Sequence, residues 1–358
     1  MIKYIGSKRG LVPLIVKVVQ ALPGVKTVLD PFSGTARVGH ALKAAGYAVT
    51  ASDHNAYAAT LATCYIQSDR GRLERKASRL IAEFNALPGQ AGYFTETFCR
   101  RSRYFQPHNG ARVDAIREAI EHKDLEPELK AVLLTSLMEA ADRVDSTTGL
   151  QMAYLKQWAP RAHNDLELRL PDLLPRARHG AGKALQLEAQ QSAEQFPVDL
   201  AYLDPPYNQH SYLGNYHIWE TLVLWDKPEV YGVACKRIDC RNRRSVFNSK
   251  KLFKEAFGTL IKSIRARYLV VSFNNEGYIN QKEMRELLRG RGEVAVLEND
   301  YKRYVGAQIG IYNPAGVKVG RISHLRNKEY LFVAGPRLPA ARLEQLTRPA
   351  GGEQLELL

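Results

Sequence analysis

The run Asp204-Pro205-Pro206-Tyr207 combines residue types that suit chemistry on an amino group attached to an aromatic ring. Two successive prolines hold the backbone in a rigid, non-helical turn that leaves a carbonyl exposed. The Asp204 carboxylate and the Pro205 carbonyl are both hydrogen-bond acceptors, so together they can take the two hydrogens of an exocyclic amine. Tyr207 offers a flat face on which a base can stack. The run therefore predicts a site for an aromatic amine.

The chemistry expected at such a site is direct substitution at nitrogen. An aromatic amine is a poor nucleophile because its lone pair is delocalised into the ring. Hydrogen bonds to both N–H groups favour a pyramidal nitrogen and localise that lone pair. In-line attack on an activated methyl group can then follow, with proximity and electrostatics supplying most of the acceleration and no covalent enzyme intermediate.

A second group of residues predicts a nucleoside-binding turn near the N-terminus. The run Asp30-Pro31-Phe32-Ser33-Gly34-Thr35 follows a short apolar strand, and its glycine lets the backbone approach a ligand closely. Asp53, at the tip of the next strand, is placed to accept both hydroxyls of a ribose. A dinucleotide fingerprint needs three glycines, whereas this chain has Ala36 between Gly34 and Gly39. The turn therefore suits a nucleoside without phosphates, and S-adenosylmethionine is such a ligand.

The elements that must position these motifs follow the order of a doubly wound α/β domain. Apolar runs predict strands over 25–29, 48–51, 198–203, 268–273, 294–297 and 330–333. Within this α/β pattern, helices are predicted over 38–45, 252–264 and 282–288. Between residues 65 and 185 helical periodicity dominates, over 73–84, 113–122 and 128–141. That middle segment is long for a crossover connection, so we interpret it as an inserted subdomain.

At these residues the chain resembles the Dam-like and FokI-type amino-methyltransferases, which modify N6 of adenine in DNA. The resemblance rests on residues 204–207 and 30–35, and Tyr4-Ile5-Gly6-Ser7-Lys8 resembles the cofactor-binding segment that precedes the glycine turn. Segments similar to later motifs and to the insertion of the FokI-type branch are 268–275, 301–304, 103–117 and 142–158. The order of motifs matches the group whose target-recognition domain lies between the two halves of the catalytic fold.

The resemblance implies an α/β, Rossmann-like S-adenosylmethionine-dependent methyltransferase fold with a mostly helical inserted target-recognition domain. We expect a discontinuous catalytic domain over 1–64 and 185–336, the insertion over 65–184 and a tail over 337–358. The sheet is expected to be mostly parallel, with an antiparallel closing strand near the C-terminus. Because both motifs follow strands, they should converge at the carboxyl edge of the sheet.

The resemblance also implies roles for individual residues. Asp204, Pro205, Pro206 and Tyr207 would hold a flipped adenine. The S-adenosylmethionine pocket would be lined by Tyr4, Gly6, Lys8, Asp30, Phe32, Gly34, Thr35, Asp53 and Glu188. Glu188 stands where the family usually has an aspartate near the end of the third strand, so its longer side chain is a departure from the pattern.

The charge of the chain favours a polyanionic partner. Its 358 residues include 51 Lys and Arg against 37 Asp and Glu, a formal net charge of +14. We expect double-stranded DNA, because a buried base must swing out while cations hold the distorted backbone. The predicted DNA contacts are Arg101, Arg103, Tyr104, Lys156, Lys236, Arg237 and Arg303. The resemblance adds a cognate restriction endonuclease as a partner at the level of the whole system.

Other reactions and one other class of protein stay open at this point. Cytosine N4 in DNA and adenine in RNA are alternative targets, although cytosine-N4 enzymes more often begin the catalytic motif with serine. Cytosine-C5 methylation is disfavoured because it needs a nucleophilic thiol, typically after proline, and no cysteine here follows a proline. A catalytically inactive nucleic-acid-binding relative is the alternative of another class, and it would be expected to lose affinity for S-adenosylmethionine.

The cysteines and the N-terminus bear on compartment. Cys64, Cys99, Cys235 and Cys240 form no C-x-x-C pair, so we expect free thiols and no metal site. The N-terminus carries no signal-peptide pattern, and no apolar run reaches transmembrane length. The expectation is a soluble cytoplasmic protein without a membrane partner.

Overall fold

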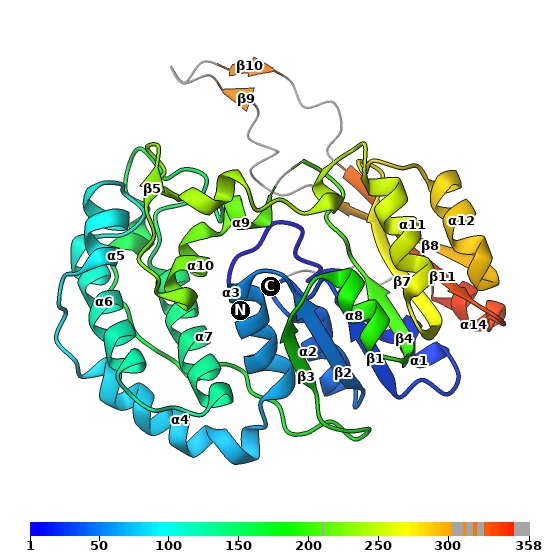
Figure 1. Ribbon diagram of the computed structural model, residues 1–358, viewed down its shortest axis with the longest axis horizontal. Coiled ribbons are helices and arrows are strands. Elements are labelled where there is room, and N and C mark those ends of the chain that lie inside the picture. Colours follow the sequence, from blue (N-terminus) through cyan, green and yellow to red (C-terminus); the bar gives the residue numbers. More distant parts are fainter. Residues whose placement is uncertain (210, 303–310, 313–317, 321–325, 347–358) are drawn as a thin grey trace, which may run out of the picture.

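A seven-stranded sheet fills one half of the molecule and a group of helices fills the other (Figure 1). The computed structural model describes residues 1–209, 211–302, 311–312, 318–320 and 326–346. In spatial order the strands are β3 (Lys183–Gln186), β2 (Ala48–Asp53), β1 (Thr27–Asp30), β4 (Val198–Leu203), β7 (Ala266–Asn274), β11 (Arg326–Gly335) and β8 (Glu293–Lys302). All pairs from β3 to β7 are parallel, whereas β11 is antiparallel to both β7 and β8. The mostly parallel sheet with a reversed strand near the C-terminus confirms the prediction.

The central strands are apolar on both faces, as strands covered on both sides must be. Adjacent residues of one strand enter two separate cores, for example Val270 in the first and Val271 in the second. The first core is covered by α1 (Val12–Ala21), α2 (Arg37–Ala44) and α14 (Ala340–Gln345). The second is covered by α8 (Ala189–Gln195), α11 (Phe253–Ser263) and α12 (Gln281–Leu288). The carboxyl edge of the strands stays free of both helix layers.

The other half of the molecule is a helical lobe, formed by residues 70–170 together with 211–241 (Figure 1). Its main helices are α4 (Arg70–Asn85), α6 (Pro107–Glu121), α7 (Pro127–Arg143) and α10 (His217–Leu224). Helix α3 (Ala56–Ala62) packs against both β2 and the lobe helices α7 and α10. The first core of the sheet continues through α3 into the lobe, so the two halves share one apolar interior.

The remaining elements are short. They are α5 (Tyr93–Thr95), α9 (Tyr212–Asn215), β5 (Val230–Tyr231), β6 (Lys236–Arg237), β9 (Ile311–Tyr312), β10 (Lys318–Gly320) and helical turns at 63–67, 96–100, 160–163, 238–241, 246–248 and 289–291. Strands β5 and β6 form an antiparallel hairpin in the helical lobe. Among the described residues, no helix has the length and apolar character needed to span a bilayer.

Two observations bear on the predicted domain limits. Strand β3 begins at Lys183, so the sheet resumes two residues before the expected boundary. Residues 211–241, assigned to the catalytic segment, lie with the helical lobe, where α10 contacts α7. Sequence order hid this second contribution because the segment follows the catalytic motif directly. The predicted tail contains the helix α14, whose Leu343 is buried in the first core.

Candidate active site

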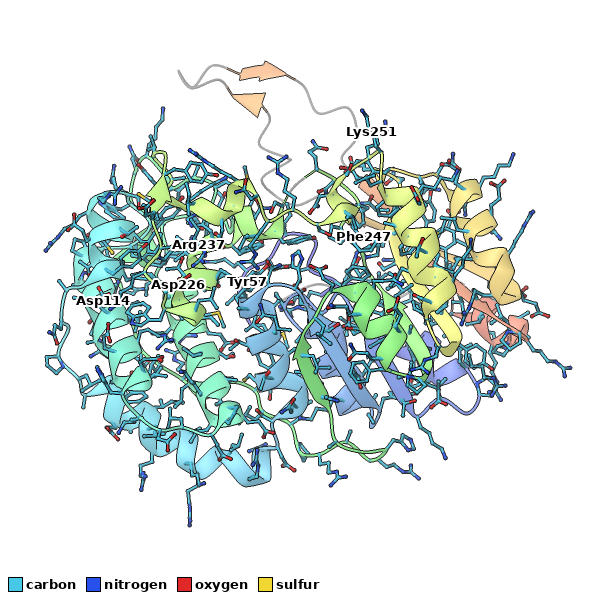
Figure 2. The ribbon with its side chains drawn as sticks, viewed as in Figure 1. Tyr57, Asp114, Asp226, Arg237, Phe247 and Lys251 are labelled. Carbon is cyan, nitrogen blue, oxygen red and sulfur yellow. The ribbon has the colours of Figure 1, made fainter. Side chains whose placement is uncertain are left out.

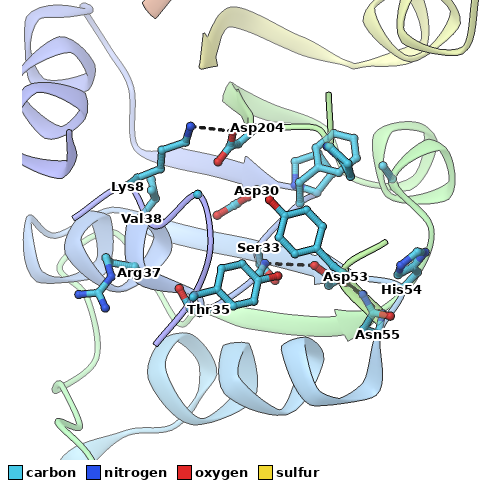
Figure 3. Close-up of a pocket in the computed structure, with 18 of the residues that line it drawn as sticks. Lys8, Asp30, Ser33, Thr35, Arg37, Val38, Asp53, His54, Asn55 and Asp204 are labelled. Atoms are coloured by element: carbon cyan, nitrogen blue, oxygen red, sulfur yellow. Dashed lines mark hydrogen bonds and ion pairs between the residues drawn. The ribbon is translucent and has the colours of Figure 1, made fainter. Parts of the chain in front are cut away.

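A pocket of about 790 Å³ opens at the carboxyl ends of β1, β2 and β4, where an open parallel sheet commonly binds its ligand (Figure 3). Eleven of the predicted catalytic and cofactor-binding residues line it together: Tyr4, Gly6, Lys8, Asp30, Phe32, Gly34, Thr35, Asp53, Glu188, Asp204 and Pro206. They come from segments separated by as many as about two hundred residues. The predicted convergence of the glycine turn and the Asp204 motif is therefore present in the fold.

The glycine turn is held in shape by Asp53. The backbone of the turn is left-handed at Gly34, with φ +49°, and at Ala36, with φ +59°. One Asp53 oxygen accepts the Gly34 N–H at 3.1 Å, and the other accepts the Asn55 N–H at 3.0 Å. The Asn55 side-chain N–H also donates to that second oxygen, at 3.2 Å, so the lone pair that can accept a ligand hydroxyl is on the oxygen that binds Gly34. The same side chain thus shapes the turn and faces the pocket.

Asp30 presents an unsatisfied acid to the pocket. The residue is 1% exposed, and its Oδ1 atom has no hydrogen-bond partner among the described residues. Burial, together with the neighbouring Asp204, raises the pKa of the Asp30 carboxyl to about 8. A buried acid of this kind calls for a cationic or hydrogen-bonding ligand. S-adenosylmethionine, with its sulfonium and ammonium groups, is a ligand that fits such a carboxyl group.

Asp204 lies in a buried cluster with Lys8 and Glu329. The Lys8 ammonium is 3.2 Å from Asp204 Oδ1 and also pairs with Glu329, which in turn accepts the Ser272 hydroxyl at 2.8 Å. Burial raises the pKa of Asp204 to about 6; Lys8 acts to lower this pKa and Glu329 to raise it. Burial alone would lower the pKa of Lys8, but its anionic neighbours raise it well above the ordinary value. Lys8 therefore remains a cation directly beside Asp204 (Figure 3).

Tyr207 connects the catalytic run with the predicted later motif at 268–275. Its ring packs edge-on against Phe273, with centroids 5.1 Å apart, and its hydroxyl accepts the Asn274 side-chain N–H at 3.1 Å. The Lys8 ammonium lies 5.7 Å from the ring centroid. Pro205 is buried and, like Tyr207, flanks the pocket instead of lining it. The structure thus fixes the orientation of the aromatic ring next to Asp204.

An aromatic stack anchors the N-terminal segment beside the pocket. The Tyr4 ring lies 4.5 Å from that of Tyr216 and 5.2 Å from that of Tyr212, with nearly parallel planes. The Tyr4 and Tyr57 hydroxyls share a hydrogen bond of 3.1 Å. Gly6 adopts φ +71°, and a Cβ there would lie 3.2 Å from the Tyr212 hydroxyl. This packing brings the segment that carries Lys8 across the sheet edge.

Glu188 lies at the pocket wall, two residues after the end of β3. Its carboxylate is 3.3 Å from His54 Nδ1, and the hydrogen bond from His54 lowers the pKa of Glu188. The Gln191 side chain accepts the Glu188 N–H, which fixes the start of α8. The departure from aspartate therefore leaves an acid at the expected place, with a neighbouring histidine as its partner.

Two predicted DNA contacts are corrected by the structure. Tyr104 is fully buried, and its hydroxyl donates to the Gln151 carbonyl at 2.8 Å. Arg237 is 3% exposed, and two of its nitrogens each donate to an Asp226 oxygen at 2.7 Å. Asp239 binds the same guanidinium. Because these polar groups are satisfied inside the helical lobe, both residues stabilise the lobe and present no surface to a nucleic acid.

The other predicted DNA contacts have different positions. Arg101 and Lys156 are exposed, and Lys236 is half-buried in β6. The Arg103 guanidinium lies 4.9 Å from the Trp158 ring centroid and donates to the Lys156 carbonyl at 3.0 Å. Arg303 lies outside the described residues. The sequence prediction for these residues stands as a prediction.

Several pocket residues were not identified from the sequence. They are Glu329 beside Lys8, and the lining residues Arg37, His54, Asn55, Tyr202, Tyr212, Ser245 and Phe247. Glu329 precedes the apolar run at 330–333, which was predicted to be a strand, but nothing in the sequence linked it to Lys8. Phe247 had no sequence signal, since it lies in a basic segment outside the motifs that carry the resemblance.

Comparison with known proteins identifies a family over most of the chain. The model of the D12 class N6 adenine-specific DNA methyltransferases matches residues 4–287. Type II methyltransferase M.NlaIII from Neisseria lactamica is 30% identical over 313 residues, covering 84% of this chain and 92% of the relative. Type II methyltransferase M.FokI from Planomicrobium okeanokoites is 30% identical and modification methylase StsI from Streptococcus sanguinis 29% identical, each over 84% of this chain. The chain spans about half the length of these last two relatives, 49% and 48%.

Proposed function

The chain belongs to the D12 class of N6 adenine-specific DNA methyltransferases, and from this premise we propose how its residues hold the base and the methyl donor. The enzyme transfers methyl from S-adenosylmethionine to adenine N6 in DNA, which the family and its type II relatives establish. The observation that carries the proposal is the meeting of Asp204 and the unsatisfied Asp30 in one pocket.

The base is held by the run from Asp204 to Tyr207. The Asp204 carboxylate and the Pro205 carbonyl accept the two N6 hydrogens, and the Tyr207 ring stacks on the flipped adenine. Lys8 keeps Asp204 in its ionised, acceptor form through the 3.2 Å ion pair. Asp204 is also the nearest carboxylate to take the proton that the nitrogen releases once it has been methylated. Attack is direct and in line, and the chain's contribution is positioning and electrostatics.

S-adenosylmethionine supplies a methyl group activated by a positively charged sulfur. We assign its binding to Asp30 and Asp53, with Phe32, Gly34 and Thr35 of the glycine turn forming the wall between them. Burial disfavours the ionised form of Asp30, and a cation bound beside it supplies the counter-charge that stabilises this form. Tyr4, Gly6 and Glu188 complete the pocket.

Double-stranded DNA is the proposed substrate form, with the helical lobe as the target-recognition part. A base inside a duplex must leave the stack to reach a pocket at the sheet edge, which costs a few kcal/mol. Arg101, Arg103, Lys156 and Lys236 are the candidate backbone contacts in the lobe. A cognate restriction endonuclease is proposed as a system-level partner, because the relatives are named type II methyltransferases and modification methylases.

The test is transfer of labelled methyl from S-adenosylmethionine to unmethylated genomic DNA, followed by mass spectrometry of the nucleosides. We expect N6-methyladenine, formed on duplex DNA and not on single-stranded RNA of matched sequence. Product sequencing then gives the recognition site. N4-methylcytosine as the product would refute the assignment of the Asp204–Tyr207 run to adenine, and preferential methylation of RNA would refute the proposed substrate form.

A further inference from the structure

The chain crosses from the helical lobe to the sheet through a short segment over the pocket, residues 243–248, which we call the strap. It follows the turn at 238–241, and α11 (Phe253–Ser263) begins five residues after its end. Figure 1 shows the chain between β6 and α11 passing from one half of the molecule to the other along the edge that carries the pocket. Two strap residues, Ser245 and Phe247, line that pocket.

Phe247 forms an apolar part of the pocket wall. Its side chain is 5% exposed, and its ring meets Phe32 of the glycine turn edge to face, with centroids 5.0 Å apart and planes at 89°. Figure 2 places Phe247 between α11 and the centre of the molecule. The two rings therefore make an aromatic corner directly beside the glycine turn. A corner of this kind suits the flat faces of a purine.

The first end of the strap is tied to a buried acid of the helical lobe. Arg243 Nη1 donates to Glu220 Oε1 at 3.0 Å, and Glu220 is completely buried on α10. The other Glu220 oxygen accepts the backbone N–H of Tyr57 at 3.0 Å, in the first turn of α3. Asp239 also binds Arg243, at 3.1 Å. A buried carboxylate needs such a partner, so the ion pair fixes where the strap starts.

The second end of the strap is tied to the catalytic run. The Asn248 side chain donates to the Asn208 carbonyl at 2.9 Å, one residue after Tyr207. The Asn248 carbonyl accepts the Tyr278 hydroxyl at 2.9 Å. Phe247 is therefore held between two anchored neighbours instead of lying on a free loop. Its position depends on both the helical lobe and the catalytic turn.

We propose that the strap is a wall of the cofactor site: Phe247 contacts the adenine end of the methyl donor, and Arg243 is a positioning residue that sets Phe247 through Glu220. The inference rests on the proposed function of the pocket and adds to it a segment outside the catalytic motifs. It makes cofactor affinity depend on the helical lobe. The strap and its flanks also bear the exposed cations Arg241, Arg244 and Lys250, which places a cofactor contact and candidate DNA contacts on one segment.

The experiment measures the affinity of S-adenosylhomocysteine for the full chain without DNA, by calorimetry, and the unfolding temperature of each variant. Phe247→Leu keeps the apolar volume but removes the aromatic face, and we expect about tenfold weaker binding, which corresponds to about 1.4 kcal/mol. Phe247→Tyr keeps the ring and should bind within twofold of the wild type. Val246→Ala, at a strap residue that is 47% exposed, is the matched control and should leave binding unchanged.

Arg243 is tested by the same binding measurement and by steady-state kinetics. Arg243→Ala should weaken S-adenosylhomocysteine binding and raise KM for the methyl donor more than it lowers kcat, with partial rescue in Arg243→Lys. If Phe247→Leu binds as well as the wild type, and the wild type methylates DNA, the inference is wrong while the proposed function stands. If the wild type itself does not bind S-adenosylhomocysteine, both are wrong.

Discussion

The pocket and the helical lobe treat buried charge in opposite ways. In the pocket, Asp30 is buried with one oxygen lacking a partner among the described residues, so its carboxyl group is available to a ligand. In the lobe, the buried Arg237 has two carboxylate partners, and the buried Arg117 binds Glu121 and backbone carbonyls of α10. These buried cations of the lobe are therefore paired within the fold and stabilise it. A charged residue type alone does not indicate function; the indication comes from whether the fold satisfies the charge.

The largest effect that tests the pocket side of this contrast is expected at Asp204. Asp204→Asn keeps the shape but loses the negative acceptor, and we expect kcat to fall by about 10²–10³-fold. The affinity for S-adenosylhomocysteine should be retained, because the loss of the Asp204 charge lowers the pKa of Asp30 and so favours its ionised form. Single-turnover methyl transfer together with calorimetry measures both quantities. Near-native turnover would remove Asp204 from the mechanism.

The lobe side is tested by Arg237→Ala. The substitution leaves the carboxylates of Asp226 and Asp239, which are 42% and 29% exposed, without their shared cation. We expect the free energy of unfolding to fall by about 1–3 kcal/mol, the scale for leaving hydrogen-bonding groups without their partner. Chemical denaturation measures this. The affinity of the folded fraction for DNA should not change, since Arg237 has no exposed surface to offer.

The control for Arg237 is the exposed Arg101, where alanine should leave stability within about 0.5 kcal/mol of the wild type. If Arg101 contacts a phosphate, its alanine variant weakens DNA binding and reduces the salt dependence of that binding. A loss of DNA affinity in folded Arg237→Ala, with unaltered stability, would reverse the contrast between the two regions.

The same contrast explains which site residues could be predicted from the sequence and which could not. Residues at strand ends, such as Asp30, Asp53 and Asp204, were placed correctly at one edge because parallel strands bring their carboxyl ends together. No such rule applies to the lobe, where Arg237 and Tyr104 were predicted to bind DNA and are buried. Their partners are brought to them by tertiary packing that periodicity does not reveal. For the same reason, the contribution of residues 211–241 to the lobe was not predicted.

An intermediate effect is expected at Tyr207, where stacking and orientation can be separated. Tyr207→Ala removes the ring and should weaken productive binding of the flipped base by about 1–3 kcal/mol. Tyr207→Phe keeps the ring but loses the hydroxyl that accepts the Asn274 N–H, so only a small change is expected. The measurement is kcat/KM for a DNA duplex with a mismatched base opposite the target adenine, compared with the paired duplex. An equal loss in both variants would mean that orientation, not stacking, is the role of Tyr207.

Glu329 shows what motif reading leaves out even at the pocket. It belongs to β11, more than a hundred residues after Asp204, and no short spacing links the two. The fold brings it to Lys8 because β11 inserts beside β7. Ser272 of β7 then donates to Glu329, so the predicted later motif at 268–275 supports the cluster of Lys8, Asp204 and Glu329 indirectly. Such a link is visible only once the strand order is known.

The smallest predicted effect concerns the pH dependence that this cluster sets. The pKa of Asp204 is about 6, raised by burial and by Glu329 and lowered by Lys8, so turnover should decline as the pH falls through this value and the carboxylate takes up a proton. Glu329→Gln removes a negative charge and frees Lys8 to pair with Asp204 alone. Both changes favour ionised Asp204, so the acid limb of the kcat profile should move to lower pH.

Ser272→Ala is the matched control for Glu329→Gln, because it removes a hydrogen bond to Glu329 but keeps the carboxylate charge. Its acid limb should stay close to that of the wild type, even if its overall rate falls. A rate loss in Glu329→Gln without any displacement of the limb would mean that Glu329 only supports the structure around Lys8. A displacement to higher pH would mean that Lys8, once released from Glu329, moves away from Asp204 instead of toward it.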